Sequence, residues 1–181
     1  DSFGDYTMQT YFNVIYMPTF VINLVSAFVI KPFLKTFGDL WNSKQNKEFI
    51  KSIAKIVCIL GIATLGIDVA CFVLGVPVLS MVYGLELSPY KLEMLLLVVS
   101  GFFYAASTTM LYALSTIRKQ KLATISYIIT AIIALIVSNI FVKNFGMMGA
   151  VISNMVTTVS LFILLTIFFG YNLYKNSKEV L

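Results

Sequence analysis

Long apolar runs separated by short polar segments dominate the chain. Five of these runs reach the length of about 20 residues that crosses a hydrocarbon core. They predict membrane-spanning helices over about residues 8–30, 53–76, 92–116, 122–142 and 147–174. Because the polar segments between them are short, there is no room for a separate domain outside the membrane. We therefore expect an all-α membrane protein in which residues 1–181 form one transmembrane helical domain.

Three segments outside these spans carry their own signals. A Lys31-Pro32 pair ends the first span, and proline breaks a helix because it lacks an N–H donor and clashes with the preceding turn. Residues 38–51 mix polar positions with Trp41, Phe49 and Ile50, a composition that predicts a short helix lying in the membrane interface. Residues 78–84 (VLSMVYG) are apolar but too short to cross, so we expect them to dip into the outer surface or pack along it.

The basic residues are distributed unevenly over the predicted loops. When alternate loops are placed on opposite sides, all but two of the 13 basic residues fall on one side, and only Lys91 and Lys143 fall on the other. Lysine and arginine are retained on the cytoplasmic side, so this bias places the N-terminus outside and the C-terminus inside. The residues on the predicted inner side are Lys31, Lys35, Lys44, Lys47, Lys51, Lys55, Arg118, Lys119, Lys121, Lys175 and Lys178.

Composition supports the membrane assignment and excludes several kinds of chemistry. The chain is 59% hydrophobic and 12% charged, against roughly 25% charged residues in soluble domains, and its mean hydropathy is +0.91. The net charge is +5, and the basic residues that produce it lie beside the predicted spans. Lipid headgroups account for basic residues at these positions, so we expect no nucleic-acid partner. There is no histidine, and Cys58 and Cys71 lack metal-ligand spacing, so we expect neither a metal site nor a cofactor. No catalytic motif is present, and we expect no enzyme.

Polar residues form a stripe along the first span. At about 100° per residue, Gln9, Asn13, Tyr16, Asn23 and Lys31 fall within a sector roughly 80° wide. Asparagine and lysine are costly against lipid, so this stripe should face protein or a water-filled cavity.

A second stripe runs along the second span and consists of Gly61, Thr64, Asp68, Cys71 and Gly75. Asp68 is the only acidic residue inside a predicted span, where an ionised carboxylate must be paired or hydrated. Asp68 would be accounted for either by a proton or cation site coupled to transport or by a structural hydrogen bond or ion pair across helices. The milder polar positions of the last three spans, such as Tyr104, Thr108 and Asn154, are interpreted as packing contacts between helices.

Several short sequences occur in an order that points to a known family. They are FGDY (3–6), IKPFL (30–34), VPVLSMVYG (76–84), LSTIRKQK (114–121) and FGMMGAVISNMV (145–156). The chain resembles the C-terminal part of the Wzx-like polysaccharide biosynthesis flippases, a branch of the multidrug/oligosaccharidyl-lipid/polysaccharide exporter superfamily. In that family a Tyr-Gly element follows one span and a Gly-x-x-Gly-Ala element opens a late one. Here these would be Tyr83-Gly84 and residues 146–150.

The resemblance implies one partial bundle of a two-bundle transporter, whose N-terminal half would be a partner of this chain. It implies flipping of undecaprenyl-diphosphate-linked oligosaccharide across a bacterial inner membrane by alternating access, for surface or capsular polysaccharide. A transport path through Lys31, Asn13, Asn23 and Asp68 would suit this substrate, because a diphosphate and its sugars need a hydrated, cationic cavity. The abundance of Ile, Lys, Asn, Phe and Tyr agrees with an AT-rich bacterial genome.

Other functions stay open at the level of sequence. A peptidoglycan-precursor flippase or a drug exporter coupled to protons or sodium belongs to the same superfamily, and Asp68 favours the coupled exporter. A non-transporting membrane scaffold is the alternative from another class. In a scaffold the polar stripes would be satisfied within the helices and would leave no cavity.

Overall fold

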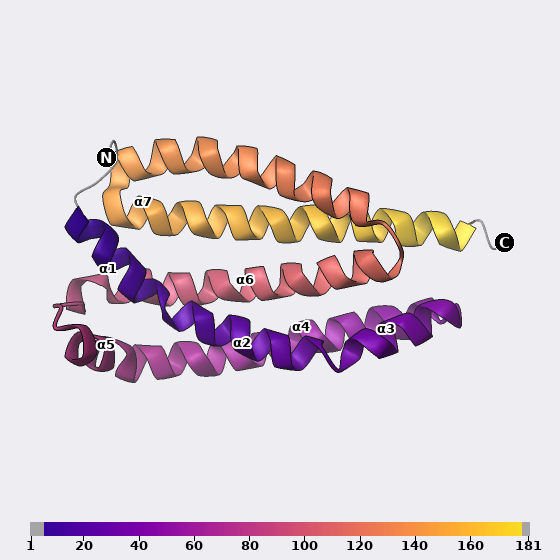
Figure 1. The fold of residues 1–181 in the computed structure, drawn as a ribbon, viewed down its shortest axis with the longest axis horizontal. Coiled ribbons are helices and arrows are strands. Elements are labelled where there is room, and N and C mark those ends of the chain that lie inside the picture. Colours follow the sequence, from indigo (N-terminus) through magenta and orange to yellow (C-terminus); the bar gives the residue numbers. More distant parts are fainter. Residues whose placement is uncertain (1–5, 179–181) are drawn as a thin grey trace.

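The computed structural model describes residues 6–178, which are almost entirely helical and contain no strand, so the all-α fold class is confirmed for this part of the chain. Figure 1 shows the helices running roughly along one long axis, with α6 in the middle of the bundle. In chain order the elements are α1 (Tyr6–Tyr16), α2 (Pro18–Ile30), α3 (Phe33–Asn42), α4 (Asn46–Ala70), η1 (Cys71–Gly75), α5 (Val76–Tyr83), η2 (Ser88–Tyr90), α6 (Lys91–Thr116) and α7 (Gln120–Lys178).

By length and composition, four helical runs within the described residues could cross a membrane. They are Tyr6–Ile30, Asn46–Tyr83, Ser88–Thr116 and Gln120–Leu173. The chain is therefore consistent with a multi-pass membrane protein. Their outer surfaces are apolar, as a lipid environment requires. The large exposed side chains include Ile62 and Leu65 on α4, Phe28 on α2 and Leu135 on α7.

The helix α7 reverses its direction in the middle. Its membrane-length part has 54 residues, which would extend about 80 Å if straight, well over twice the hydrocarbon thickness of about 30 Å. Gly146 interrupts it with φ 55° and ψ −125°, a conformation that only glycine adopts readily. Two antiparallel arms result, residues 120–145 and residues 147–178 (Figure 1). The predicted spans 122–142 and 147–174 lie one on each arm.

Prolines divide the N-terminal helical run. The predicted break at Lys31-Pro32 is confirmed, because α2 ends at Ile30 and α3 begins at Phe33. A second break was not predicted: Pro18 begins α2 immediately after Met17, within the predicted span 8–30. Pro18 cannot donate the hydrogen bond that would continue α1, so the chain bends there.

The predicted interfacial helix over residues 38–51 is wrong. The segment is divided between the end of α3 and the start of α4, joined by a tight turn at residues 43–45. Lys44 has φ 57°, its N–H donates to Trp41 O, and the next N–H, of Gln45, donates to Leu40 O at 3.0 Å. This is a Schellman termination, which reverses the chain and packs α3 against α4.

The expectation of a separate apolar segment at residues 78–84 is also wrong. The second helical run continues from α4 through η1 into α5 and ends only at Gly84, which has φ 65°. Pro77 would normally break such a helix. Here η1, a wider π-turn over Cys71–Gly75, ends two positions before the proline, and such turns accommodate local disruption of the helical ladder.

A second Schellman turn joins α6 to α7, with Arg118 at φ 58°. Lysine and arginine thus occupy two left-handed positions that cost a side-chain-bearing residue about 1–2 kcal/mol. We predict that Lys44→Gly and Arg118→Gly each stabilise the protein, by up to about 1 kcal/mol once the greater chain entropy of glycine is subtracted. Thermal unfolding in detergent would measure this. Lys35→Gly, inside α3, is the control, and it should destabilise because glycine is a poor helix former.

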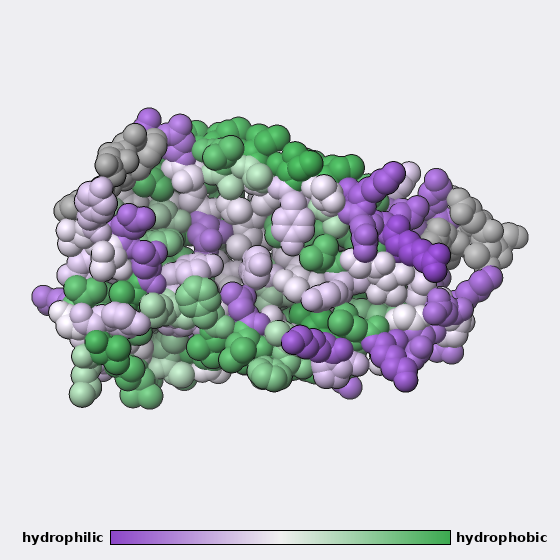
Figure 2. All heavy atoms as spheres, viewed as in Figure 1, coloured by the Kyte–Doolittle hydropathy of each residue, from purple (hydrophilic) through white to green (hydrophobic). Residues whose placement is uncertain are grey.

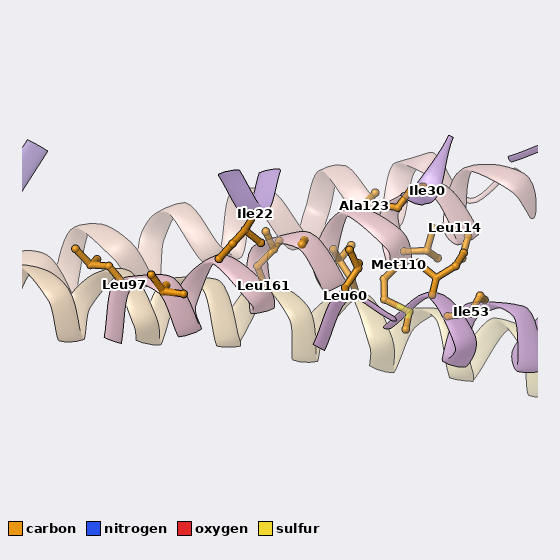
Figure 3. Packing of buried hydrophobic residues seen from close by; sticks show 14 of the residues in the cluster. Ile22, Ile30, Ile53, Leu60, Leu97, Met110, Leu114, Ala123 and Leu161 are labelled. Atoms are coloured by element: carbon orange, nitrogen blue, oxygen red, sulfur yellow. The ribbon is translucent and has the colours of Figure 1, made fainter. Parts of the chain in front are cut away.

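Buried apolar side chains from every long helix pack around α6. Figure 3 shows Ile22 and Ile30 of α2, Ile53 and Leu60 of α4, and Leu161 of α7 beside Leu97, Met110 and Leu114 of α6. A smaller aromatic cluster holds the end of the bundle. The Phe49 ring lies 5.3 Å from that of Phe37 and 5.8 Å from that of Phe169, so it links α3, α4 and the second arm of α7.

The lysine-rich segments share one end of the molecule. The α3–α4 turn, the α6–α7 turn and the C-terminal end of α7 lie together, opposite the Gly146 reversal and α5 (Figure 1). Figure 2 shows hydrophilic residues gathered at that same end and hydrophobic residues along the two long edges of the molecule. We call this the basic end. Its placement on the inner side of a membrane stays a prediction.

Candidate functional site

A small polar pocket lies between α2 and α6. Its volume is about 190 Å³, which is the volume that roughly six water molecules occupy in liquid water. Its polar side chains come from α2, from Lys31 at the end of α2, and from α6. Elsewhere α2 and α6 pack through apolar side chains. It is lined by Asn23, Ser26, Ala27, Ile30, Lys31, Tyr104, Thr108 and Tyr112.

A close helix crossing sets the position of this pocket. A Cβ atom at Gly101 of α6 would lie 2.8 Å from Thr19 Cγ2 and 2.9 Å from Ile22 Cδ1. Glycine at this position therefore lets α2 approach α6 closely. The pocket opens directly beyond the crossing, where α2 contributes Asn23 and α6 contributes Tyr104.

The wall formed by α2 has a cation at one end and an amide at the other. Lys31 is exposed, whereas Asn23 is half-buried, and eight residues of helix separate them by about 12 Å. Asn23 Oδ1 is buried and is one of the few such atoms in the described residues without a hydrogen-bond partner. Buried polar atoms are normally satisfied, and a rotation of this amide toward the pocket would let its oxygen accept a hydrogen bond from a ligand or water.

The wall formed by α6 presents three hydroxyl groups at a spacing of four residues. Tyr104 and Tyr112 are 45% and 37% exposed, so their rings are open to whatever enters the pocket. Thr108 lies between them and donates its hydroxyl hydrogen to Tyr104 O at 3.1 Å. Lys31 is the single charged residue lining the described pocket. The pocket can therefore bind a polar, anionic ligand through one charge and several hydrogen bonds.

The polar surface extends beyond the pocket to the first arm of α7. Tyr127, on this arm, lies near Tyr104 and is 40% exposed. In Figure 2 a paler band of intermediate hydropathy separates the two hydrophobic edges of this face. We call this set the polar face: Asn23, Lys31, Tyr104, Thr108, Tyr112 and Tyr127.

The structure brings together two of the four residues predicted for a transport path. Asn23 and Lys31 line the pocket, whereas Asn13 is exposed on α1 and outside the lining. Asp68 lies on α4, also outside the lining, and its buried Oδ1 has no partner in the described structure. The two stripes of the first and second spans therefore do not meet in one pocket.

The contribution of α6 was not recognised in the sequence. Tyr104 and Thr108 were interpreted as packing residues, yet both line the pocket. The repeat of hydroxyl-bearing residues every four positions, 104, 108 and 112, is the signal that could have identified them. For Asn154 the packing interpretation is confirmed, because its Nδ2 donates to Ser100 Oγ at 2.7 Å across the α6–α7 interface.

Among the described residues there is no group of three His, Cys, Asp or Glu side chains that could hold a metal ion. No family model, curated protein or solved structure matches the chain. Function must therefore be inferred from the membrane-length helices and the polar face.

Proposed function

We propose that the chain is part of a bacterial membrane transporter that flips lipid-linked oligosaccharide, in the manner of the Wzx-like flippases that it resembles. The polar face is the observation that carries this proposal. It extends over α2, α6 and the first arm of α7, all of which are apolar enough to lie in a membrane. A simple anchor has no use for such a face, because lipid contact favours uniformly apolar helices.

The chemistry of the pocket suits a sugar diphosphate. The ammonium group of Lys31 would bind a phosphate oxygen, and Asn23 with the hydroxyls of α6 would hydrogen-bond sugar hydroxyls. The exposed rings of Tyr104 and Tyr112 offer flat surfaces against which the apolar face of a sugar ring can pack. The lipid tail of the substrate would stay in the bilayer beside the apolar edges of the bundle.

The size of the pocket limits what this chain does alone. About 190 Å³ holds a few waters or a single sugar ring, not an oligosaccharide. In the proposed transporter the N-terminal half would face the polar face and close the remainder of the cavity. Alternating access then consists of the two halves opening to one membrane side at a time.

The test is replacement of Lys31 in the complete protein, as its own cell makes it. We predict that Lys31→Ala reduces surface polysaccharide at least tenfold, a loss that corresponds to about 1.4 kcal/mol of phosphate binding, and causes lipid-linked oligosaccharide to accumulate. Lys31→Arg should retain most export because it keeps the charge. Lys35→Ala is the matched control, since Lys35 is equally exposed but lies outside the pocket lining. Unchanged polysaccharide in a normally expressed Lys31→Ala strain would refute the proposal.

A drug exporter coupled to protons or sodium is the second candidate, and Asp68 favours it. Its unpartnered carboxylate oxygen lies within the apolar run Asn46–Tyr83, where a coupling ion would bind. Under this alternative Asp68→Asn abolishes an ion-dependent drug efflux and leaves surface polysaccharide intact. Under the flippase proposal there is no ion-dependent drug efflux in the unmutated strain, so Asp68→Asn leaves drug efflux unchanged.

A further inference from the structure

A large apolar groove lies on another side of the bundle, between α4, α6 and the second arm of α7. Its volume is about 740 Å³, several times that of the polar pocket. Nearly all its surface is apolar, and it is open along its length rather than enclosed. It is lined by Ile50, Ile53, Ala54, Val57, Cys58, Met110, Phe162, Thr166, Phe169, Gly170 and Leu173.

The length of the groove matches one leaflet of a membrane. Its lining on α7 extends from Phe162 to Leu173, which is about 17 Å of helix, against about 15 Å for half of a hydrocarbon core. The groove has open space at Gly170, where an added Cβ would meet no atom within 4 Å. An extended hydrocarbon chain lying along the helices would match this length and the apolar lining.

The groove begins at the basic end of the molecule. On α4, Lys47 and Lys51 continue the face formed by Ile50, Ala54 and Cys58, because these positions repeat at three- and four-residue steps. Both lysines are exposed. Lys51 Nζ lies 2.7 Å from Glu48 Oε1, in an exposed pair that contributes little. No described carboxylate pairs with Lys47. The first turn of α4, which begins at Asn46, adds the positive end of its helix dipole.

We propose that this groove binds an anionic phospholipid, with one acyl chain along the groove and the phosphate headgroup at Lys47 and Lys51. Hydrocarbon matches the apolar lining, and a net negative headgroup matches the lysines and the helix N-terminus at the mouth. A second copy of this chain is a poorer occupant. Copies inserted in the same orientation would bring their lysine-rich ends together, and like charges repel. The proposal requires only that these helices lie in a membrane, and it does not depend on oligosaccharide transport.

Photo-crosslinking in nanodiscs tests the proposal with the intact chain. The probes are phosphatidylglycerol and phosphatidylcholine that each carry a diazirine in one acyl chain, diluted in unlabelled phosphatidylcholine. We expect phosphatidylglycerol to label residues 50–58 and 162–173, with a yield roughly tenfold above phosphatidylcholine. Lys47→Gln combined with Lys51→Gln should remove that preference. Lys119→Gln combined with Lys121→Gln, which removes the same two charges from the α6–α7 turn outside the groove lining, should keep it.

Blocking the groove separates a real site from general lipid contact. Gly170→Leu places a side chain in the open part of the groove without a clash and should reduce labelling of residues 50–58 severalfold. Gly66→Leu is the matched control, because an added Cβ there also meets nothing within 4 Å but Gly66 lies outside the groove. Labelling that is equal for both lipids, or unchanged in Gly170→Leu, would overturn the proposal.

Three further outcomes would assign a different occupant and would also overturn it. Preferential labelling by a diazirine-bearing polyprenyl phosphate would identify the groove as a carrier-lipid site. Crosslinks between two protein chains at residues 162–173 would identify an interface between copies. Labelling centred on the outer α4 residues Ile62 and Leu65 would show ordinary contact with bulk lipid.

Discussion

Gly149→Ala will prevent the two arms of α7 from closing against each other. A Cβ atom built at Gly149 would overlap the carbonyl oxygen of Phe141 on the opposite arm. Because this neighbour is backbone rather than the end of a flexible side chain, the arms must move apart as rigid bodies. Overpacking typically lowers the free energy of unfolding by about 1–3 kcal/mol. Because backbone cannot move aside as a side chain does, we expect this clash to cost at least the upper limit of that range. We expect most of the folded protein to be lost.

The yield of monodisperse protein after detergent extraction, together with its thermal unfolding midpoint, measures this effect. Gly170→Ala is the control on the same arm, since a Cβ there meets nothing within 4 Å. A Gly149→Ala protein that is as stable as the Gly170→Ala protein would show that the arms do not approach as closely as the structure has them.

Phe49→Ala should have the second largest effect. Phe49 is completely buried, and its ring contacts those of Phe37, Trp41 and Phe169. The substitution removes the contact that holds the α3–α4 hairpin against the second arm of α7. Truncation of a buried phenylalanine costs about 3–5 kcal/mol, so we expect the hairpin to detach before the rest of the bundle unfolds.

Trp41 reports on this directly, because it is the only tryptophan of the chain and its ring lies 6.0 Å from that of Phe49. Its fluorescence should shift to the red in Phe49→Ala at temperatures where helicity is retained. Phe28→Ala is the control, since Phe28 is 72% exposed on α2. Equal unfolding midpoints for the two variants, with no shift in emission, would contradict the role given to Phe49.

The positions of the long helices could be predicted from the sequence because each has a continuous apolar run. The break at Lys31-Pro32 could be predicted as well, but other joints could not. The turn at residues 43–45 was missed because Lys44 takes the left-handed conformation that normally marks a glycine. The continuation of α4 into α5 was missed because Pro77 signals a break, and a π-turn that accommodates it has no sequence signature.

For the candidate site, the sequence predicts which residues share one side of a helix, but not which helices face each other. Helical periodicity places Asn23 and Lys31 on one side of their span, and the pocket contains both. Which helix faces that side depends on how α2 and α6 are rotated against each other. Gly101 and its contacts with Thr19 and Ile22 determine this, and they are distant in sequence. For the same reason the sequence could not show that Asp68 lies apart from the pocket.

Water access to the polar face is the claim on which the proposed function depends most directly. The measurement is the rate at which a charged, membrane-impermeant thiosulfonate modifies single cysteines in membrane vesicles, with Cys58→Ser and Cys71→Ala as background. We predict rapid modification of Thr108→Cys, whose side chain lines the pocket, and none of Ile62→Cys, which is 72% exposed on the apolar outer surface of α4. Equal protection of both cysteines would contradict the account, because it would mean that lipid or packed protein, not water, covers the pocket.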